Sequence, residues 1–392
     1  MNEPFFTLSS NEIILSFITG GLFLIQLLYH IIVYARPLKE AQKRKNDRST
    51  STHKEYKAVS IVVYANGDID NLQKNLPLLL NQNYPQFEVI VVNDGFDDES
   101  ENILKRFSIE NKHLYYTFVP NETQYLSHKK LALTMGIKAA KYEIILFTEI
   151  SSYPLSDQWI SSIISTYNPR TEIVLGFSSY PYNSNFFHKL VAYDNLKTGL
   201  QMIASALAHF PYIGNGNNLS YNKAIFFANK GYSHSLNLHA GADDLFINQV
   251  ATQTNTEVQY IPESIVCLNK INRYNEWRDL TMSRATTQQY YKKGSLYFYR
   301  IEYLSFVLFL CSCCITVSIG TTGNWSISIF AGLLLLLRYI VKGFIFQKSA
   351  LLLQQKPSTL WFPILEICLL FYKGYIGIYR LFKGKKDFTS KI

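Results

Sequence analysis

Two acidic turns are the first features of this chain that could support chemistry. Asp68 follows an apolar, β-branched run at 59–63, and Asp94 follows a second such run at 87–92. Both runs predict buried strands. Because ligands bind beyond the carboxyl ends of the strands in open α/β sheets, we expect the two turns to share one pocket. Carboxylates at that place suit ribose hydroxyls or a metal ion rather than bare phosphate.

The segment between the two predicted strands indicates how the turns are brought together. Leu72, Leu76, Leu79 and Leu80 recur at helical spacing. A helix there makes a strand–helix–strand crossover between the two predicted strands. The sequence contains neither a GxGxxG nor a GK[ST] motif, so neither a Rossmann dinucleotide site nor a P-loop is indicated.

The end of this helix and the end of the second strand carry a family resemblance. The helix ends in Gln82-Asn83-Tyr84-Pro85, and the strand ends in Asn93-Asp94-Gly95. With these motifs the chain resembles the family-2 glycosyltransferases, inverting enzymes of the GT-A fold that use nucleotide sugars, over roughly residues 58–295. The resemblance implies an α/β fold with a mixed sheet flanked by helices, and hexosyltransferase-type activity in polysaccharide biosynthesis. It also implies that Asp68 and Asp94 hold the nucleoside of the nucleotide-sugar donor.

The metal-binding motif of the family is altered in this chain. A buried strand predicted at 143–147 leads to Glu149-Ile150-Ser151, where the resemblance places Asp-x-Asp. In the family these carboxylates hold the divalent cation that neutralises the departing nucleotide diphosphate. The resemblance therefore implies Mg²⁺ or Mn²⁺ bound by Glu149 and Ser151, with a hydroxyl replacing the second carboxylate. The alternative is that Glu149 is only a polar strand end.

Two lysines open the helix that precedes this strand. Lys129 and Lys130 stand at the start of residues 128–140, which resemble the K-x-x-A-L-x-x-G-I-x-x-A helix of the family. The functional interpretation is that Lys129 and Lys130 form a cation pair that faces the diphosphate of the donor at a helix N-terminus, and we assign donor binding to Lys130. The alternative is a solvated helix start.

A glycine- and asparagine-rich stretch at 213–232 resembles a second family element, which lies between donor and acceptor. Gly214 and Gly216 allow close approach of the backbone. Asn217 and Asn218 offer amides for sugar hydroxyls, so the resemblance implies an acceptor role for both. A simple asparagine–glycine turn is the alternative.

The general base of an inverting transferase is a carboxylate that takes the proton of the acceptor hydroxyl. Relatives supply it two positions before the final Asp of an Asp-Leu motif, a position that Ala242 occupies here. Asp243 is the nearest carboxylate, and the resemblance implies that it acts as base beside Asp244. The alternative for this acidic pair is an N-cap of the predicted helix 245–251, a role that we assign to Asp244.

A basic segment at 273–296 resembles the family segment that lies over the donor diphosphate. The resemblance implies that Trp277 stacks on a sugar ring of the acceptor and that Arg278 and Arg284 pair with phosphate. The segment lacks the Gln-x-x-Arg-Trp motif of processive synthases, so it does not indicate a long-chain polymerase.

Membrane segments are indicated at both ends of the chain. Hydrophobic residues make up 48% and charged residues 17% of the 392 residues, and residues 13–34 are long enough to span a bilayer. The net charge of +9 gathers beside the apolar segments, which favours anionic lipid over nucleic acid. By the positive-inside rule we expect a multi-pass protein of the cell membrane with a cytoplasmic catalytic domain, membrane lipids as partners and no nucleic acid.

The expected organisation has five parts. They are a transmembrane anchor at 1–35, a basic polar linker at 36–57 that is flexible over 39–56, the cytoplasmic domain at 58–298, a transmembrane hairpin at 299–346, and a third apolar segment with a basic tail at 347–392. Within the last part, we prefer an interfacial helix at 359–382 to a full span.

Two other classes of function compete with the enzyme. Because the metal and base motifs are both altered, the chain could be a non-catalytic scaffold or glycan-binding membrane protein that keeps the fold. A transporter is disfavoured, because we expect no paired charges within the apolar segments.

Overall fold

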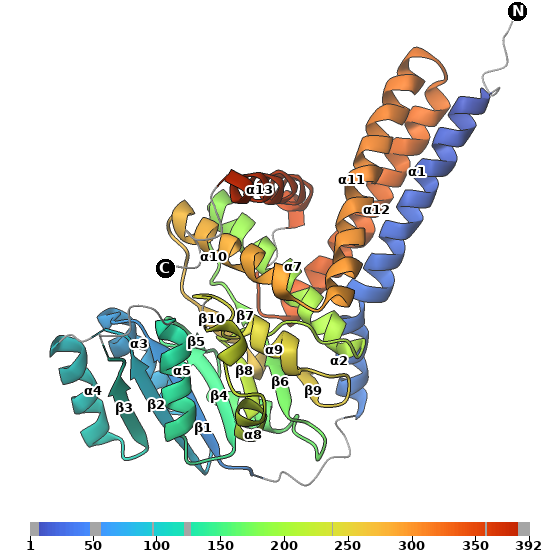
Figure 1. Ribbon diagram of the computed structural model, residues 1–392. Coiled ribbons are helices and arrows are strands. Elements are labelled where there is room, and N and C mark those ends of the chain that lie inside the picture. Colours follow the sequence, from blue (N-terminus) through green and yellow to red (C-terminus); the bar gives the residue numbers. More distant parts are fainter. Residues whose placement is uncertain are drawn as a thin grey trace, which may run out of the picture.

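The computed structural model describes residues 8–47, 56–95, 98–120, 127–236, 238–356 and 359–382. An α/β domain forms one end of the molecule, and a bundle of three long helices extends from it (Figure 1). The bundle consists of α1 (Ser10–Leu28), α11 (Lys293–Thr322) and α12 (Trp325–Leu352). Segments from both ends of the sequence therefore lie side by side in the bundle.

The domain is built on a mixed sheet of seven strands with the order β3-β2-β1-β4-β8-β6-β9. β8 is antiparallel to β4 and β6, whereas β1 is parallel to β2 and β4. A second sheet has the order β5-β10-β7. The strands are β1 (Val59–Ala65), β2 (Phe87–Asn93), β3 (Leu114–Phe118), β4 (Ile144–Glu149), β5 (Ser152–Pro154), β6 (Ile173–Gly176), β7 (Ser178–Ser179), β8 (Leu219–Asn222), β9 (Thr256–Gln259) and β10 (Val266–Leu268).

Helices cover both faces of the large sheet, and the alternation along β1 shows why. Ile61 and Val63 belong to the apolar core shared with α3, α4 and α6, whereas Val62 belongs to the core shared with α5 and α7. The helices of the domain are α3 (Ile69–Leu80), α4 (Asp98–Glu110), α5 (His128–Ala139), α6 (Trp159–Ile164), α7 (Phe186–Leu207), α8 (Lys223–Ala228), α9 (Asp244–Val250) and α10 (Tyr274–Thr287).

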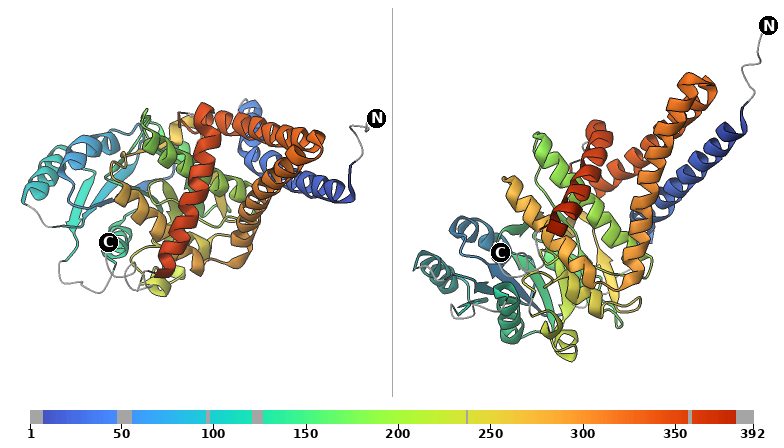
Figure 2. Two further views of the ribbon diagram at one scale, coloured as in Figure 1. Left: turned by 90° about the horizontal axis from the view of Figure 1, so that it is seen from above. Right: turned by 45° about the horizontal axis from the view of Figure 1, so that its top comes forward.

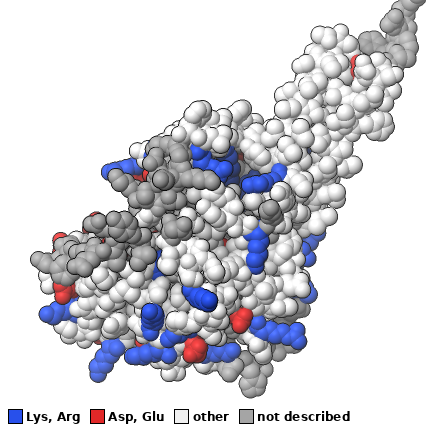
Figure 3. Space-filling view, viewed as in Figure 1, with Lys and Arg blue, Asp and Glu red and all other residues white. Residues whose placement is uncertain are grey.

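Four described helical segments are long and apolar enough to cross a membrane: 10–45, 296–322, 325–352 and 362–382. The surface of the bundle is almost free of charged side chains, which gather on the domain (Figure 3). The last segment is α13 (Phe362–Phe382), which lies across the direction of the bundle and packs on α7 and α10 (Figure 2). The interfacial position that the sequence analysis assigned to α13 stays a prediction.

The linker expected after the first apolar segment is not flexible where the structure describes it. Residues 29–34 form a π-helical turn, and α2 (Arg36–Asp47) continues from it. Tyr260 donates a hydrogen bond to the Pro37 carbonyl, and Arg44 donates to the Val258 carbonyl at 3.1 Å. The prediction of a flexible linker is wrong because the described part of this segment forms a helix. One side of the helix packs on the domain, and polar side chains on the other side face solvent. Residues 48–55 lie outside the described part.

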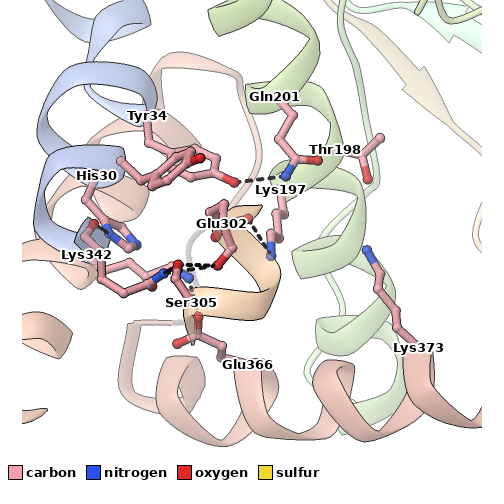
Figure 4. A network of polar contacts seen from close by, with 12 residues as sticks. His30, Tyr34, Lys197, Thr198, Gln201, Glu302, Ser305, Lys342, Glu366 and Lys373 are labelled. Atoms are coloured by element: carbon pink, nitrogen blue, oxygen red, sulfur yellow. Dashed lines mark hydrogen bonds and ion pairs between the residues drawn. The ribbon is translucent and has the colours of Figure 1, made fainter. Parts of the chain in front are cut away.

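Charges lie paired among the apolar segments, which the sequence analysis did not predict. Glu366 on α13 accepts hydrogen bonds from both terminal nitrogens of Arg338, each at 2.9 Å, and from Lys342 on α12. Lys197 of α7 faces Glu302 of α11 at 3.7 Å (Figure 4). The prediction of no paired charges is wrong because each carboxylate and its cations come from different helices. The pairs therefore cannot be recognised within any one apolar segment. We refer to these five residues as the buried charge cluster.

Candidate active site

Three parallel strands, β1, β2 and β4, end at one edge of the large sheet. The register pairs Ala65 with Asn93 and Tyr64 with Glu149. The Asp94 N–H donates to the Ala65 carbonyl at 2.6 Å, so the turns after β1 and β2 are adjacent. Side chains at this edge are therefore the first candidates for contact with a ligand.

Asp68 has a local role at the start of α3. It is the N-cap residue, and its carboxylate accepts hydrogen bonds from the Asn71 N–H at 3.1 Å and from the Asn71 side-chain amide at 2.5 Å. The contact with a nucleoside that the sequence analysis assigned to Asp68 stays a prediction.

Asp94 connects two strands and one helix at the same edge. It accepts hydrogen bonds from the Tyr64 hydroxyl and from Nδ1 of His128, both at 2.8 Å. Burial and the bond to Asp94 raise the pKa of Tyr64 above its ordinary value, so the phenol stays a neutral donor. The sequence analysis missed Tyr64 and His128, because neither belongs to a motif and both approach Asp94 only in the folded chain.

Glu149, at the end of β4, is paired with a lysine. Lys129 Nζ lies 2.5 Å from Glu149 Oε1, and the Ser151 hydroxyl lies 3.4 Å from Glu149 Oε2. The side chains of Lys129 and Glu149 are 31% and 24% exposed, so a ligand can reach both. Glu149, the predicted metal ligand, is thus paired with an ammonium group, and its role as a ligand stays a prediction.

Lys130 does not face a diphosphate, and this corrects its predicted role. It is 1% exposed, and its ammonium group donates to the carbonyls of Ser235 at 2.5 Å and Leu238 at 2.7 Å. Desolvation lowers its pKa to about 8. A sequence signal for this burial exists, because Lys130 shares the spacing i, i+3, i+7 with the buried Leu133 and Ile137.

Asp243 lines the same hollow as Glu149. This hollow, the acidic hollow from here on, is lined by Lys129, Glu149, Gly216 and Asp243 among others. The Gly216 N–H donates to Asp243 Oδ2 at 2.7 Å. A Cβ on Gly216 would lie only 3.0 Å from that oxygen, so glycine permits this close approach. The fold therefore brings the predicted base and the predicted metal ligand, about a hundred residues apart in the chain, to one cavity.

Asp244 is held by other side chains and does not line the acidic hollow. Its carboxylate accepts hydrogen bonds from Thr287 Oγ1 at 2.5 Å and from the Tyr291 hydroxyl at 2.6 Å. Desolvation and the charge of Asp243 raise its pKa. The predicted N-cap role is also corrected, because the N-cap position of α9 is Asp243, whose side chain makes no capping bond.

The two asparagines assigned to the acceptor differ in surroundings. Asn218 is fully buried, accepts a hydrogen bond from Trp159 Nε1 at 3.1 Å and donates to the carbonyls of Phe177 and Ser264. Its amide is thus committed to joining strands and loops, which corrects its predicted contact with a sugar. Asn217 is half-buried, and its acceptor role stays a prediction.

The segment expected over the diphosphate forms α10. Trp277 is 3% exposed and stacks on Tyr372 of α13 with ring centroids 3.8 Å apart, so its ring does not present a face to a sugar, contrary to the prediction. Arg278 pairs with the adjacent Asp279 at 2.9 Å. Arg284 lies further along the same helix and is half-buried. Phosphate contacts of both arginines stay predictions.

The residues of the acidic hollow do not fit a divalent cation as they stand. Mg²⁺ and Mn²⁺ take oxygen ligands, and the only predicted carboxylate ligand, Glu149, is neutralised by Lys129 at 2.5 Å. Within the described residues, no group of three or more His, Cys, Asp or Glu side chains is arranged to hold a metal ion. The chemistry of the site is therefore derived from the side chains alone.

Comparisons with known proteins agree with this architecture. Residues 59–227 match the family model described as glycosyl transferase family 2. A poly-β-1,6-N-acetyl-D-glucosamine synthase of Staphylococcus epidermidis is 26% identical over 119 residues, which are 30% of this chain and only 26% of that relative.

Solved structures add a likeness of fold. A mannosyltransferase from Pyrobaculum calidifontis, in complex with GDP-Man and Mn²⁺, has a TM-score of 0.51 at 15% identity, over 86% of this chain and 99% of that one. TarS of S. aureus in complex with UDP-GlcNAc has a TM-score of 0.40 at 14% identity, over 74% of this chain and 81% of that one. The fold assignment rests on the first of these.

Proposed function

Residues 59–227 form a family-2 glycosyltransferase domain of the GT-A fold, and on this premise we propose that the chain is a membrane-bound, inverting hexosyltransferase of polysaccharide biosynthesis. The donor is a nucleotide sugar, and the acceptor is a lipid-linked or growing glycan at the membrane face. The similarity of 119 residues to a polysaccharide synthase supports this choice of acceptor.

One observation carries the proposal: Asp243 and Glu149 line one hollow at the carboxyl edge of the parallel strands. A base and a charged group that receives the diphosphate must lie on opposite sides of the sugar in an inverting displacement. The acidic hollow is lined by both kinds of group, a carboxylate in Asp243 and a charged pair in Lys129 and Glu149.

The reaction is a single displacement at the anomeric carbon. The acceptor oxygen forms a bond to that carbon, the bond to the diphosphate oxygen breaks, and its electron pair leaves with the nucleoside diphosphate. Asp243 takes the proton of the acceptor hydroxyl. The Gly216 N–H holds Oδ2 of this carboxylate at 2.7 Å, which fixes the orientation of the base.

Binding of the donor nucleoside is assigned to the turns after β1 and β2. Asp94 is oriented by Tyr64 and His128, each at 2.8 Å, so its carboxylate is held ready for a hydroxyl of the ribose. Asp68 stands in the adjacent turn. Arg278 and Arg284 of α10 are the candidates for contact with the diphosphate from the membrane side of the domain.

The proposed site of the acceptor follows from the arrangement in the membrane that we propose. We assign α1, α11 and α12 to the bilayer and α13 to its cytoplasmic surface, so that the domain takes its donor from the cytoplasm. The apolar faces of the bundle support this, since Phe17, Leu304 and Leu333 expose more than half of their surface. The basic residues of α2 follow the first of these helices, in agreement with the positive-inside rule.

The test is sugar transfer by the full chain in detergent, with labelled UDP-, GDP- and dTDP-sugars and membrane extract as the source of acceptor. We expect one donor to be consumed and label to enter a lipid-extractable or polymeric product. Asp243→Asn should lower the rate about a hundredfold or more, because the base is lost. Asp157→Asn, at an exposed position, is the matched control and should leave the rate unchanged.

Two results would contradict the proposal. If no donor is consumed although nucleotides bind and extract is present, the chain is a scaffold that keeps the fold. If Asp243→Asn transfers sugar at the rate of the unaltered chain, the base is another residue and the assignment of the hollow is wrong.

A further inference from the structure

The Lys129 ammonium group lies in the acidic hollow, which Glu149 and Asp243 also line. Its Nζ lies 2.5 Å from Glu149 Oε1 and 5.9 Å from the centre of the Tyr64 ring. A lysine ammonium has an ordinary pKa of about 10.4, and the Glu149 carboxylate beside it favours its charged form. Lys129 is therefore a permanent cation at the end of β4.

This cation competes with any metal ion for Glu149. A hard cation bound at this place would depend on one carboxylate, because the hydroxyl of Ser151 replaces the second. That carboxylate already has its charge neutralised at 2.5 Å by Lys129. Two cations that share one carboxylate repel each other, so binding a metal requires displacing the lysine.

The ammonium group is also suited to hold a phosphate itself. It has three donors, so it can keep its bond to Glu149 and donate to a phosphate oxygen at the same time. Its side chain is 31% exposed and lines the acidic hollow. Lys129 is the second residue of α5, whose N-terminal partial charge adds to the attraction for an anion.

We propose that Lys129 takes the place of the divalent cation at the leaving diphosphate, so that this chain binds its donor and releases the nucleotide without a metal. The inference rests on the proposed function. In the displacement, the diphosphate oxygen that receives the electron pair of the broken bond is neutralised by the Lys129 ammonium, and no further reactant is needed.

The experiment is calorimetric titration of the full chain in detergent with UDP, GDP and dTDP as probes, in EDTA and in Mn²⁺. For the nucleotide that binds best, we expect dissociation constants within about twofold of each other in the two conditions. Lys129→Met, which keeps the length of the side chain, should weaken binding in EDTA about tenfold or more, since a hydrogen bond to a charged group is lost. Lys129→Arg should lose much less.

Two further variants make the test specific. Lys138→Met removes an exposed lysine from the same helix and should bind like the unaltered chain. The triple variant Lys129→Met, Glu149→Asp, Ser151→Asp rebuilds two aspartates without the competing ammonium, and Mn²⁺ should strengthen its binding about tenfold or more.

Results that overturn this inference differ from results that refute the proposed function. Binding by the unaltered chain that needs Mn²⁺ and is lost in EDTA overturns the inference, and so does a Lys129→Met variant that binds as tightly as the unaltered chain. If Lys129→Met does not fold, the comparison of EDTA with Mn²⁺ on the unaltered chain still decides. Absence of binding by all three nucleotides in both conditions refutes the proposed function itself.

Discussion

Two lysine–glutamate pairs in this molecule have the same chemistry and opposite settings. Lys129 and Glu149 meet at the acidic hollow with side chains 31% and 24% exposed, whereas Lys342 and Glu366 meet between α12 and α13 at 0% and 4%. The first pair has room for an incoming anion. The second is sealed, and Arg338 completes it with two further bonds to the same carboxylate.

The sealed pair is satisfied by the protein alone. Gln26 of α1 accepts hydrogen bonds from Arg338 and donates to Ser305 of α11 at 2.7 Å, so polar groups join the three helices of the bundle to α13. Removing charges from water is expensive, and it is tolerated here because each group has partners. The comparison teaches that an ion pair by itself does not mark a site; exposure beside a cavity separates a ligand-binding pair from a structural one.

The largest effect should come from breaking the sealed pair. Glu366→Gln leaves Arg338 and Lys342 buried without a carboxylate, and we expect a loss of about 3–5 kcal/mol in the free energy of unfolding. Denaturation in detergent, followed by tryptophan fluorescence, measures it. The combined replacement Arg338→Met, Lys342→Met, Glu366→Leu should restore most of the stability. A loss below about 1 kcal/mol for Glu366→Gln would show that this pair is not sealed from water.

The neighbouring lysines of α5 give the next largest contrast. Lys130→Met leaves the carbonyls of Ser235 and Leu238 without their donor, and should destabilise the chain by about 1–3 kcal/mol. Lys129→Met should cost less than about 1 kcal/mol, because its pair is partly exposed. Thermal unfolding of the two variants side by side measures the difference. Equal losses would mean that Lys129 is as structural as Lys130.

A third and smaller effect concerns the attachment of α13. Asp194 of α7 pairs with Lys373 at 3.0 Å, and although desolvation opposes it, Lys373 and Arg284 hold the pKa of Asp194 below its ordinary value. Such a carboxylate stabilises the fold above its unfolded pKa of about 3.9, and the stabilisation is lost as pH falls. Asp194→Asn should therefore cost about 1–2 kcal/mol at pH 7, and this cost should shrink as pH falls below about 4.

Unfolding of this variant and of the unaltered chain between pH 3 and pH 7 measures the difference. A gap between the two that stays constant with pH would contradict the ionic origin of the attachment.

The smallest effect on stability should come from Glu149→Gln. The pair that it breaks is partly exposed, so the free energy of unfolding should change by less than about 1 kcal/mol. Thermal unfolding measures this change. A loss as large as that of Glu366→Gln would mean that the two pairs do not differ in kind.

Much of the fold could be predicted from the sequence, because local pattern determines it. The runs at 59–63 and 87–92 and the leucines between them are the strands β1 and β2 and the helix α3. The strand predicted at 143–147 overlaps β4, and the apolar segments are long helices. In each case the side chains that face the core recur with the period of the element itself.

The site was harder to predict, because its contacts join residues far apart in the chain. Nothing near Asp94 indicates that Tyr64 and His128 will bind it, and nothing near Glu366 indicates Arg338. Trp277 was expected to contact a sugar because of its place in a motif, but Tyr372 of α13 stacks on its ring instead. Tertiary contacts of this kind leave no period in the sequence.

The most direct test is an experimental structure of the full chain with the nucleoside diphosphate that binds best, prepared in EDTA. The account predicts that the diphosphate lies in the acidic hollow within hydrogen-bond distance of Lys129 Nζ, with the nucleoside against Asp94. A nucleotide bound elsewhere, or a diphosphate that leaves Lys129 paired only with Glu149, would contradict it.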